Sequence, residues 1–321
     1  MMTPRERLLS ALSLEQPDRV PYFEYAIDER LIESLNGRRL TRHEVCHLYD
    51  VCDVEFWKKP PVFAEGRKSD IGREYLGAGL ISCLDDWHRV SLPEPVTPQE
   101  VRAARQFIYE KQELAAGLVI NLSADPVLMS LGYERFALTL YDDPGLIEEM
   151  SEGYTNWTLK VLEAFQELPF DFVLSGDDLA FKTAPFFSPE VFQRVFLPHM
   201  RRVAQSIERP WIHHSDGNLL PILDDLLSLG MNGLHPVEPA AMDIFWLKEH
   251  YGRRVCLCGN FDVNILALGT PDEVRAEVKR KVCALKRGGG HVAASSTSIP
   301  EYVRPENFAA MVDELRRCGV Y

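Results

Sequence analysis

The stretch that decides the fold is WIHHSDGN (211–218), GLHPVEP (233–239) and RRVCLCGNFD (253–262), with helix-like segments between the three pieces. Each piece is a short apolar run that ends on polar side chains, namely His214 and Asp216, then Glu238, then Asn260 and Asp262. Such runs are typical of parallel strands buried on both faces, whose carboxyl ends meet at one mouth. We therefore expect the functional groups of the chain at this mouth.

The alternation of strand and helix extends over the whole chain. Eight short apolar runs are candidate strands: Val20–Glu24, Val51–Trp57, Leu118–Asn121, Phe172–Ser175, Trp211–His214, Gly233–Val237, Val255–Cys258 and His291–Ala294. Helical segments follow most of them, at 28–36, 144–168, 188–207, 218–229, 241–251, 270–287 and 305–318. Eight β-then-α units predict an α/β fold, a (β/α)8 TIM barrel formed by one domain over residues 1–321. An open doubly wound sheet stays an alternative, although no G-x-G-x-x-G follows the first strand.

Helix starts are marked by one recurring device. Thr3, Thr97 and Thr270 are each followed by proline and, at the third position, by glutamate, which is the pattern of a capping box. The first of these predicts a helix ahead of the first strand. The segment Leu80–Val90 (LISCLDDWHRV) is predicted to form an inserted hairpin with Asp85 and Asp86 near its turn.

Composition and charge narrow the class of protein. The 321 residues are 46% hydrophobic and 26% charged, with a net charge of −13 and no basic face, which argues against nucleic-acid binding. No apolar run approaches the ~18 residues of a membrane span, and MMTPRERLLSAL lacks the apolar core of a signal peptide. The seven scattered cysteines are typical of reduced thiols, so we expect a cytoplasmic protein.

The predicted strand ends are rich in carboxylates. The candidate catalytic residues are Asp177, Asp178, His214, Asp216 and Glu238, and the candidate substrate-binding residues are Glu24, Trp57, Asn121, Phe186, Asn260 and Asp262. Lys58 and Lys182 are the basic residues close to these ends, and no arginine occupies one. Carboxylates crowded in a water-poor mouth raise one another's pKa, so one of them could carry a proton at neutral pH, and His214 could do the same work or ligate a metal.

Several of these residues also have purely structural interpretations. Asp177 and Asp178 could form a turn or cap a helix, Asp216 could cap the helix that follows it, and Asn260 could satisfy backbone groups in its own loop. His213 and His214 are adjacent and face opposite ways, and we expect His213 to pack against the outer helices. Cys256 and Cys258 are expected to pack inside the barrel.

At these residues the chain resembles the uroporphyrinogen decarboxylase superfamily. The similarity is carried by RERLLSAL…QPDRVP, SGDDLAFKTAPFFSPEVFQRVFLPH, HHSDGNLLPILDDLLSLGMNGLHPVEP, CGNFDV, GGGHVAASSTSI and PENFAAMVDELRRCGVY, which together run nearly end to end. The resemblance implies a (β/α)8 barrel with an N-terminal helical extension, in agreement with the count of strands.

Two branches of this superfamily differ at places that the sequence can distinguish. Decarboxylases of uroporphyrinogen carry an arginine-rich segment of the form RQAGR after the first strand, whereas this chain has FEYAIDERLIES, with Glu24, Asp28 and Glu29. Corrinoid-dependent methyltransferases that use a zinc thiolate carry H-x-C on the fifth strand and a late cysteine. Here His214-Ser215-Asp216 and Ser295-Ser296-Thr297 stand at those places.

The resemblance therefore implies a methyltransferase without the zinc-thiolate set. We expect it to move a methyl group from a small donor, such as a methoxylated aromatic compound, to the cobalt of a corrinoid carried by a separate corrinoid protein. Trp57, Phe186 and Phe187 would form apolar walls, Asn260 would orient the substrate, and one acid would protonate the leaving atom.

The other possibilities that the sequence leaves open are a zinc site formed by His214, Glu238 and one more acid, and a homodimer. The alternative function is a decarboxylase that acts on a porphyrinogen or a smaller carboxylate, for which a basic residue such as Lys58 or Lys182 should lie in the mouth. A third alternative is a non-catalytic barrel whose acids are solvated.

Overall fold

Seven parallel strands form the central sheet of the protein. The computed structural model describes residues 1–68 and 74–321. The strand order is β1-β4-β5-β6-β7-β8-β9, and every neighbouring pair is parallel. The strands are β1 (Asp53–Trp57), β4 (Ala115–Ile120), β5 (Phe172–Gly176), β6 (Trp211–His214), β7 (Gly233–His235), β8 (Cys256–Cys258) and β9 (His291–Val292).

The eighth place in the ring is taken by the segment around Tyr22, which closes the barrel. Tyr22 forms parallel bridges with Val51 on one side and with Ala293 on the other. Its carbonyl accepts from the N–H of Cys52 at 2.7 Å, and the N–H of Phe23 donates to the carbonyl of Ala293 at 2.9 Å. The predicted (β/α)8 fold is thereby confirmed, with one correction. Residues 20–24 make single bridges instead of a regular strand, because Pro21 has no N–H to extend the ladder.

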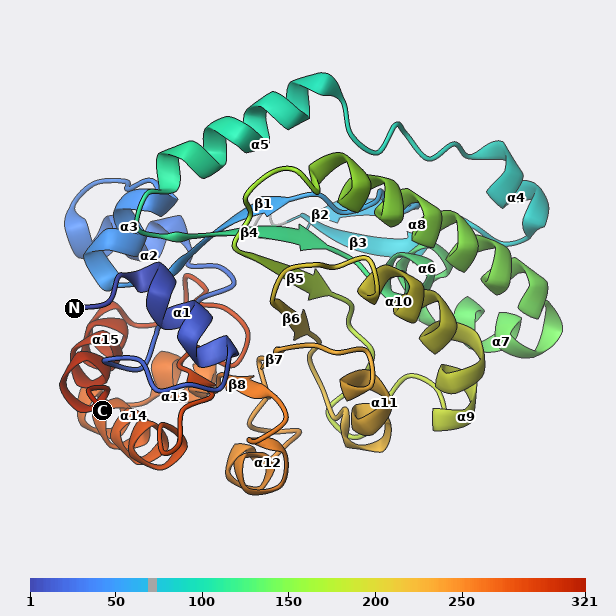
Figure 1. Cartoon of the computed structure of the whole chain (residues 1–321). Helices are drawn as coiled ribbons and strands as arrows, with labels where there is room; N and C mark the ends of the chain where they lie inside the picture. Colours follow the sequence, from blue (N-terminus) through green and yellow to red (C-terminus); the bar gives the residue numbers. More distant parts are fainter. Residues whose placement is uncertain (69–73) are drawn as a thin grey trace.

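Helix α1 (Pro4–Leu12) closes the amino-terminal end of the barrel. Its Leu8, Ala11 and Leu12 are fully or almost fully buried among inward-facing strand residues such as Val119 and Ile212. In Figure 1 the arrows of β4 and β5 point away from α1, so the opposite end of the barrel is the mouth. The predicted N-terminal helical extension is thus confirmed, and Cys256 and Cys258 lie in the interior cluster as expected.

Helices surround the sheet in the order that the sequence predicts. The longer helices are α2 (Glu29–Asn36), α3 (Arg42–Tyr49), α5 (Pro98–Lys111), α8 (Pro144–Phe165), α10 (Leu197–Ala204), α12 (Ile244–Tyr251), α14 (Pro271–Leu285) and α15 (Pro305–Cys318). The shorter or locally added ones are α4 (Leu84–Arg89), α6 (Ala124–Leu131), α7 (Tyr133–Asp142), α9 (Pro189–Val191), α11 (Leu223–Leu227) and α13 (Val263–Leu268). Capping boxes are present at Thr3, Thr97 and Thr270. Within the described residues, none of the helices is both long and apolar enough to cross a bilayer.

Two predicted elements are wrong in detail. The inserted hairpin is formed by β2 (Ala64–Lys68) and β3 (Glu74–Gly79), ahead of the predicted Leu80–Val90. Most of that segment is helix α4, because Asp85 and Asp86 stand in a helical first turn, where carboxylates are favourable. The predicted helix at 188–207 is interrupted by a π-helical turn at Phe192–Phe196.

Candidate active site at the carboxyl ends of the strands

The inward-facing residues at the strand ends converge on the mouth. Trp57 ends β1 and Lys59 follows it with the same parity, while His214 ends β6 and His235 ends β7. His214 and His235 are register partners on neighbouring parallel strands, so their side chains face the same side. The mouth therefore holds two imidazoles, an indole and an ammonium group above the apolar interior of the barrel.

The two histidines form a directly hydrogen-bonded pair. Nδ1 of His214 lies 2.8 Å from Nδ1 of His235, so one ring donates and the other accepts. Tyr25 stacks on His214 with ring centroids 4.5 Å apart and planes 10° apart. Burial lowers the pKa of His214 to about 4 and that of His235 well below its usual range. Both imidazoles are consequently neutral at pH 7, and His214 acts there as a hydrogen-bonding group rather than as an acid.

Asp178 is the carboxylate nearest to this pair. Its Oδ1 lies 3.8 Å from Nε2 of His214 and accepts a hydrogen bond from the N–H of Asp216 at 3.0 Å. The Asp178 side chain keeps 39% of its surface exposed. A solvent-accessible carboxylate beside a neutral imidazole can accept a proton or a hydrogen bond from a ligand, and can thereby orient that ligand.

Two further acids in the mouth hold protons near neutral pH. Burial, with the charges of Asp177 and Asp178, raises the pKa of Asp125 to about 8. Burial, with the charges of Asp178 and Glu238, raises the pKa of Asp216 to about 7. Oδ1 of Asp216 is buried without a hydrogen-bond partner among the described atoms. These two groups can therefore act as general acids.

Asp177 lies beside Asp178 in the chain but has a different environment. It is fully buried, and its carboxylate accepts from the backbone N–H groups of Leu122, Ser123 and Asp125 at 2.6, 3.3 and 3.1 Å. Burial raises its pKa, while these hydrogen bonds oppose the shift. Asp177 thus fixes the loop that leads from β4 into α6, and it has no surface open to a ligand.

Several other predicted site residues are engaged in local hydrogen bonds. The Asn260 amide donates to the carbonyl of Val237 at 2.6 Å, and Asp262 caps α13 by accepting from the N–H of Asn264. The Asn121 amide donates to the carbonyl of Gly176 at the base of the mouth and to Asp125. Of these three, only Asn121 directly contacts another polar group of the mouth, namely Asp125.

Glu24 lies on the outer side of the barrel seam, not in the open mouth. It is fully buried and accepts from the N–H and the hydroxyl of Ser295 at 2.9 and 2.7 Å. Burial raises its pKa to about 7. These hydrogen bonds link the first and last strand positions, so Glu24 helps to hold the barrel closed.

Glu238 faces the loop after β6. Its carboxylate accepts from the N–H of Gly217 at 3.2 Å and lies 3.6 Å from Nζ of Lys182. Lys182 is 67% exposed, which makes this pair a rim contact. Glu238 therefore lies at the edge of the mouth, within electrostatic range of Asp216.

Aromatic side chains line the open rim. Trp57, 48% exposed, packs its edge on Tyr25 at 5.1 Å between ring centroids. Phe186 packs against Phe181 at 4.4 Å and Tyr133 at 5.0 Å, and Phe181 is 57% exposed. The rim therefore offers flat apolar surface on two sides of the polar groups.

The lysine in the mouth is Lys59, not Lys58 as the sequence suggested. Lys58 points outward and forms an ion pair with Glu100 of α5. Nζ of Lys59 lies 3.4 Å from both the Tyr25 hydroxyl and the Gly176 carbonyl, and 5.3 Å from the centre of the Trp57 ring. The mouth thus contains a cation among its acids.

The arrangement does not fit a bound zinc ion. His214 is engaged with His235, and Glu238 is engaged with Gly217 and Lys182. Over residues 1–68 and 74–321, no three His, Cys, Asp or Glu side chains are grouped as a metal site requires.

Four residues of the mouth were not among the candidate site residues: Tyr25, Lys59, Asp125 and His235. His235 had a detectable signal, since GLH and IHH are consecutive strands that each end on histidine. Lys59 shares the parity of Trp57, a predicted site residue, and this relation selects it over Lys58. Tyr25 lies two residues after Phe23 and shares its face. Because Phe23 faces the barrel interior, Tyr25 also points inward.

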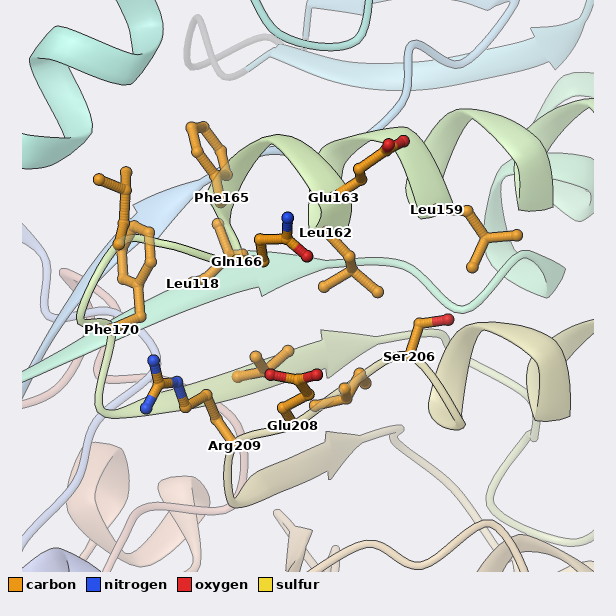
Figure 2. A pocket seen from close by; sticks show the side chains of 13 residues that line it. Leu118, Leu159, Leu162, Glu163, Phe165, Gln166, Phe170, Ser206, Glu208 and Arg209 are labelled. Atoms are coloured by element: carbon orange, nitrogen blue, oxygen red, sulfur yellow. The ribbon is translucent and has the colours of Figure 1, made fainter.

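A separate hollow of about 320 Å³ lies on the outer wall (Figure 2). Its walls are mainly aliphatic and aromatic, from α8 and the outer face of the sheet, with Glu163, Gln166, Glu208 and Arg209 as polar groups. Leu168 and Phe170 precede β5, and Arg209 precedes β6, so the hollow opens at the amino ends of the strands. It is remote from the mouth and carries none of the candidate catalytic groups.

The chain is also similar to known proteins, in some cases over most of its length. A uroporphyrinogen decarboxylase from Neisseria meningitidis is 27% identical over 134 residues, which are 39% of this chain and 36% of that protein's length. A uroporphyrinogen decarboxylase from Pseudomonas aeruginosa is 24% identical over 282 residues, covering 79% of this chain and 74% of that protein. The Neisseria match thus spans about a third of its relative.

Solved structures confirm the fold. A methyltransferase from Methanosarcina mazei superimposes with a TM-score of 0.74 at 20% identity, covering 99% of both chains. A B12-independent methionine synthase from Shewanella sp. W3-18-1 gives a TM-score of 0.56 at 10% identity, covering 94% of this chain and 95% of that one. The family model described as Uroporphyrinogen decarboxylase (URO-D) matches residues 87–318. The chain therefore belongs to the uroporphyrinogen decarboxylase (URO-D) family.

Proposed function

We propose that this protein is a methyltransferase that takes a methyl group from a small methoxylated aromatic compound and delivers it to a corrinoid carried by a partner protein. The observation that carries the proposal is the position of Asp125 and Asp216, whose pKa values of about 8 and about 7 leave protons available at neutral pH among aromatic walls. Cleavage of an aryl methyl ether needs such a donor, because the leaving oxygen is a poor leaving group until it is protonated.

The chain's residues would perform positioning and proton transfer. The corrinoid would supply the nucleophile that accepts the methyl group. The aromatic ring of the donor would lie against Trp57 and Tyr25. As the C–O bond breaks, its electron pair stays on the phenolic oxygen, which takes the proton from Asp216 or Asp125. The exposed aromatic rim, including Phe181, offers a flat surface on which a planar macrocycle of a partner could rest.

A spectroscopic assay tests this proposal directly. The purified protein is mixed with a reduced corrinoid protein and a panel of methoxylated aromatics, and the absorbance change that accompanies methylation of the corrinoid is followed. We expect a signal that falls as the pH rises through about 8, because Asp125 then loses its proton. His214→Ala and Glu238→Ala should each slow the reaction, and full activity in both variants would contradict the assignment of the site.

One observation favours a second function. Lys59 places a cation in the mouth, as expected for a decarboxylase that holds a carboxylate substrate, and the relatives cited above carry that name. Release of CO₂ from an aromatic or porphyrinogen carboxylate, with no methyl transfer in the corrinoid assay, would establish this alternative and remove the first.

A further inference from the structure

Lys59 is the feature of the mouth that the proposed proton transfer leaves without a role. Its ammonium group carries three N–H donors. Its hydrogen-bond partners among the described residues are the Tyr25 hydroxyl and the Gly176 carbonyl, both at the long distance of 3.4 Å. Within the described parts of the chain, it forms no ion pair with a carboxylate, whereas Lys58 and Lys182 both do. Lys59 therefore retains donor capacity toward the mouth.

The surroundings of Lys59 hold its ammonium group in place. The Trp57 ring lies 5.3 Å away, a distance at which a cation is attracted to the ring face. Gly176 leaves room for the ammonium on the other side, since a Cβ there would lie only 2.8 Å from Nζ and 3.3 Å from the Tyr25 hydroxyl. The carbonyl of Gly176 also accepts from Asn121, which fixes this point of the backbone. Three strand ends thus converge around one cation.

We propose that Lys59, with Tyr25 and Trp57, forms an anion subsite that makes the substrate an aromatic carboxylate. The ammonium would donate to the carboxylate while the ring of the substrate packs against the aromatic side chains. The proposal deepens the proposed function by naming the class of methyl donor, a methoxylated aromatic acid. It rests on that function only in placing the substrate at the mouth.

Direct binding of unreactive ligands tests the subsite without any methyl transfer. Benzoate and benzamide have the same shape and differ in charge, so titration calorimetry of the intact protein with each ligand isolates the anionic contact. We expect benzoate to bind about tenfold or more tightly than benzamide, as a charge-assisted hydrogen bond would give. Equal affinity for the two ligands, or no binding of benzoate at millimolar concentration, would overturn the proposal.

Variants at neighbouring positions separate a ligand contact from a general charge effect. Lys59→Gln should abolish the preference for benzoate, and Lys59→Arg should retain most of it. Lys58→Gln is the matched control, since it removes the same charge one residue away on the outer side, and it should leave the preference intact. Gly176→Ala keeps the charge but displaces Nζ, and it should weaken benzoate binding. If Lys59→Gln keeps the wild-type preference, the subsite is wrong.

Failure of the subsite and failure of the proposed function give different results. If 4-methoxybenzoate binds through Lys59 but donates no methyl group to the corrinoid, the subsite stands and the methyltransferase proposal falls. If neutral methoxybenzene donates its methyl group as readily as 4-methoxybenzoate, the methyltransferase stands and the subsite falls.

Discussion

Asp177 and Asp178 show how two adjacent carboxylates can take different tasks at one strand end. Asp177 points into the barrel wall and accepts three backbone N–H groups of the loop before α6, whereas Asp178 lies half-exposed beside His214. Asp177 therefore holds the shape of the mouth, and Asp178 is accessible to ligands.

Substitution of these two acids should separate stability from activity. Asp177→Ala leaves three buried donors without an acceptor and should lower the free energy of unfolding by about 3 kcal/mol or more. Asp178→Ala removes a half-exposed group and should change it by less than about 1 kcal/mol, while slowing the proposed methyl transfer. Urea unfolding monitored by fluorescence measures both, and equal losses of stability would contradict the assignment.

The histidine pair should behave as one unit. His214→Ala and His235→Ala each remove one partner of the same buried hydrogen bond, so the second substitution should cost less once the first is made. We expect the double variant to lose about 1–3 kcal/mol less stability than the sum of the single variants. Unfolding free energies of the four proteins give this coupling, and simple additivity would show that the 2.8 Å contact contributes nothing.

The sequence predicted which side chains face the mouth in part, because strand parity is a local property. Alternation placed His214 inward and His213 outward, and His213 is indeed fully buried with Ser175 as its hydrogen-bond partner on the helix-facing side. Parity gives the face on which a side chain lies. It does not tell whether a carboxylate is exposed or is hydrogen-bonded to a loop that is distant in the sequence. Asp177 and Glu24 were therefore placed among the site residues, although their partners lie 55 and 271 residues away.

At the scale of elements, the barrel interior depends on a close match between neighbouring strands. Gly117 of β4 is the register partner of Phe172 of β5, and a Cβ at Gly117 would lie 2.4 Å from that ring. Phe172 is fully buried, so its ring has no space into which to move. The absence of a side chain at Gly117 is thus what admits a large aromatic residue to the interior.

Gly117→Ala should destabilise the protein by about 1–3 kcal/mol through overpacking. Gly66→Ala is the matched control, since Gly66 also lies in a strand, β2, but its added Cβ would meet no atom of the described residues within 4 Å. Thermal or urea unfolding of the two variants provides the comparison. Similar stability of the two variants would mean that the interior around Phe172 can relax.

Elements were predicted well where one local signal dominated. The threonine-proline capping boxes located the starts of α1, α5 and α14, because a cap depends on four consecutive residues. Helix α3 was missed although Thr41 and Glu44 form the same box, which there lacks the proline. The hairpin was misplaced because paired aspartates are common both in turns and in the first turn of a helix. Tertiary packing distinguishes the two, since Trp87 of this segment packs against Tyr154 of α8.

For the whole molecule, buried acids should make stability depend on pH. The folded pKa values of Glu24 and Asp216 are raised to about 7 and that of Asp125 to about 8, above the unfolded values near 4. The stability that such groups contribute is complete below about pH 4 and is lost as the pH rises through 7 to 8. Between the unfolded and the folded pKa, each acid that stays protonated in the folded state lowers the free energy of unfolding by about 1.4 kcal/mol per pH unit.

We therefore expect the urea midpoint to fall between pH 6.5 and pH 8.5. The buried histidines do not offset this loss, since their lowered pKa values reduce stability only as the pH falls below about 6.5. Asp125→Asn, which is neutral at every pH, should show a smaller fall. Asp142→Asn, at an exposed position, should keep the wild-type dependence. A midpoint that stays constant over this range would show that the three acids are ionised in the folded protein.

The seam at Tyr22 has a consequence for how the chain is made. The first strand position pairs with residues near the end of the chain, and Glu24 meets Ser295 across 271 residues. On the ribosome, the amino-terminal segment therefore has no second neighbour until Ala293 and Ser295 have emerged. The nascent sheet stays open until then, and the ring can close only after these residues are synthesised, because non-local pairing needs both partners to be present.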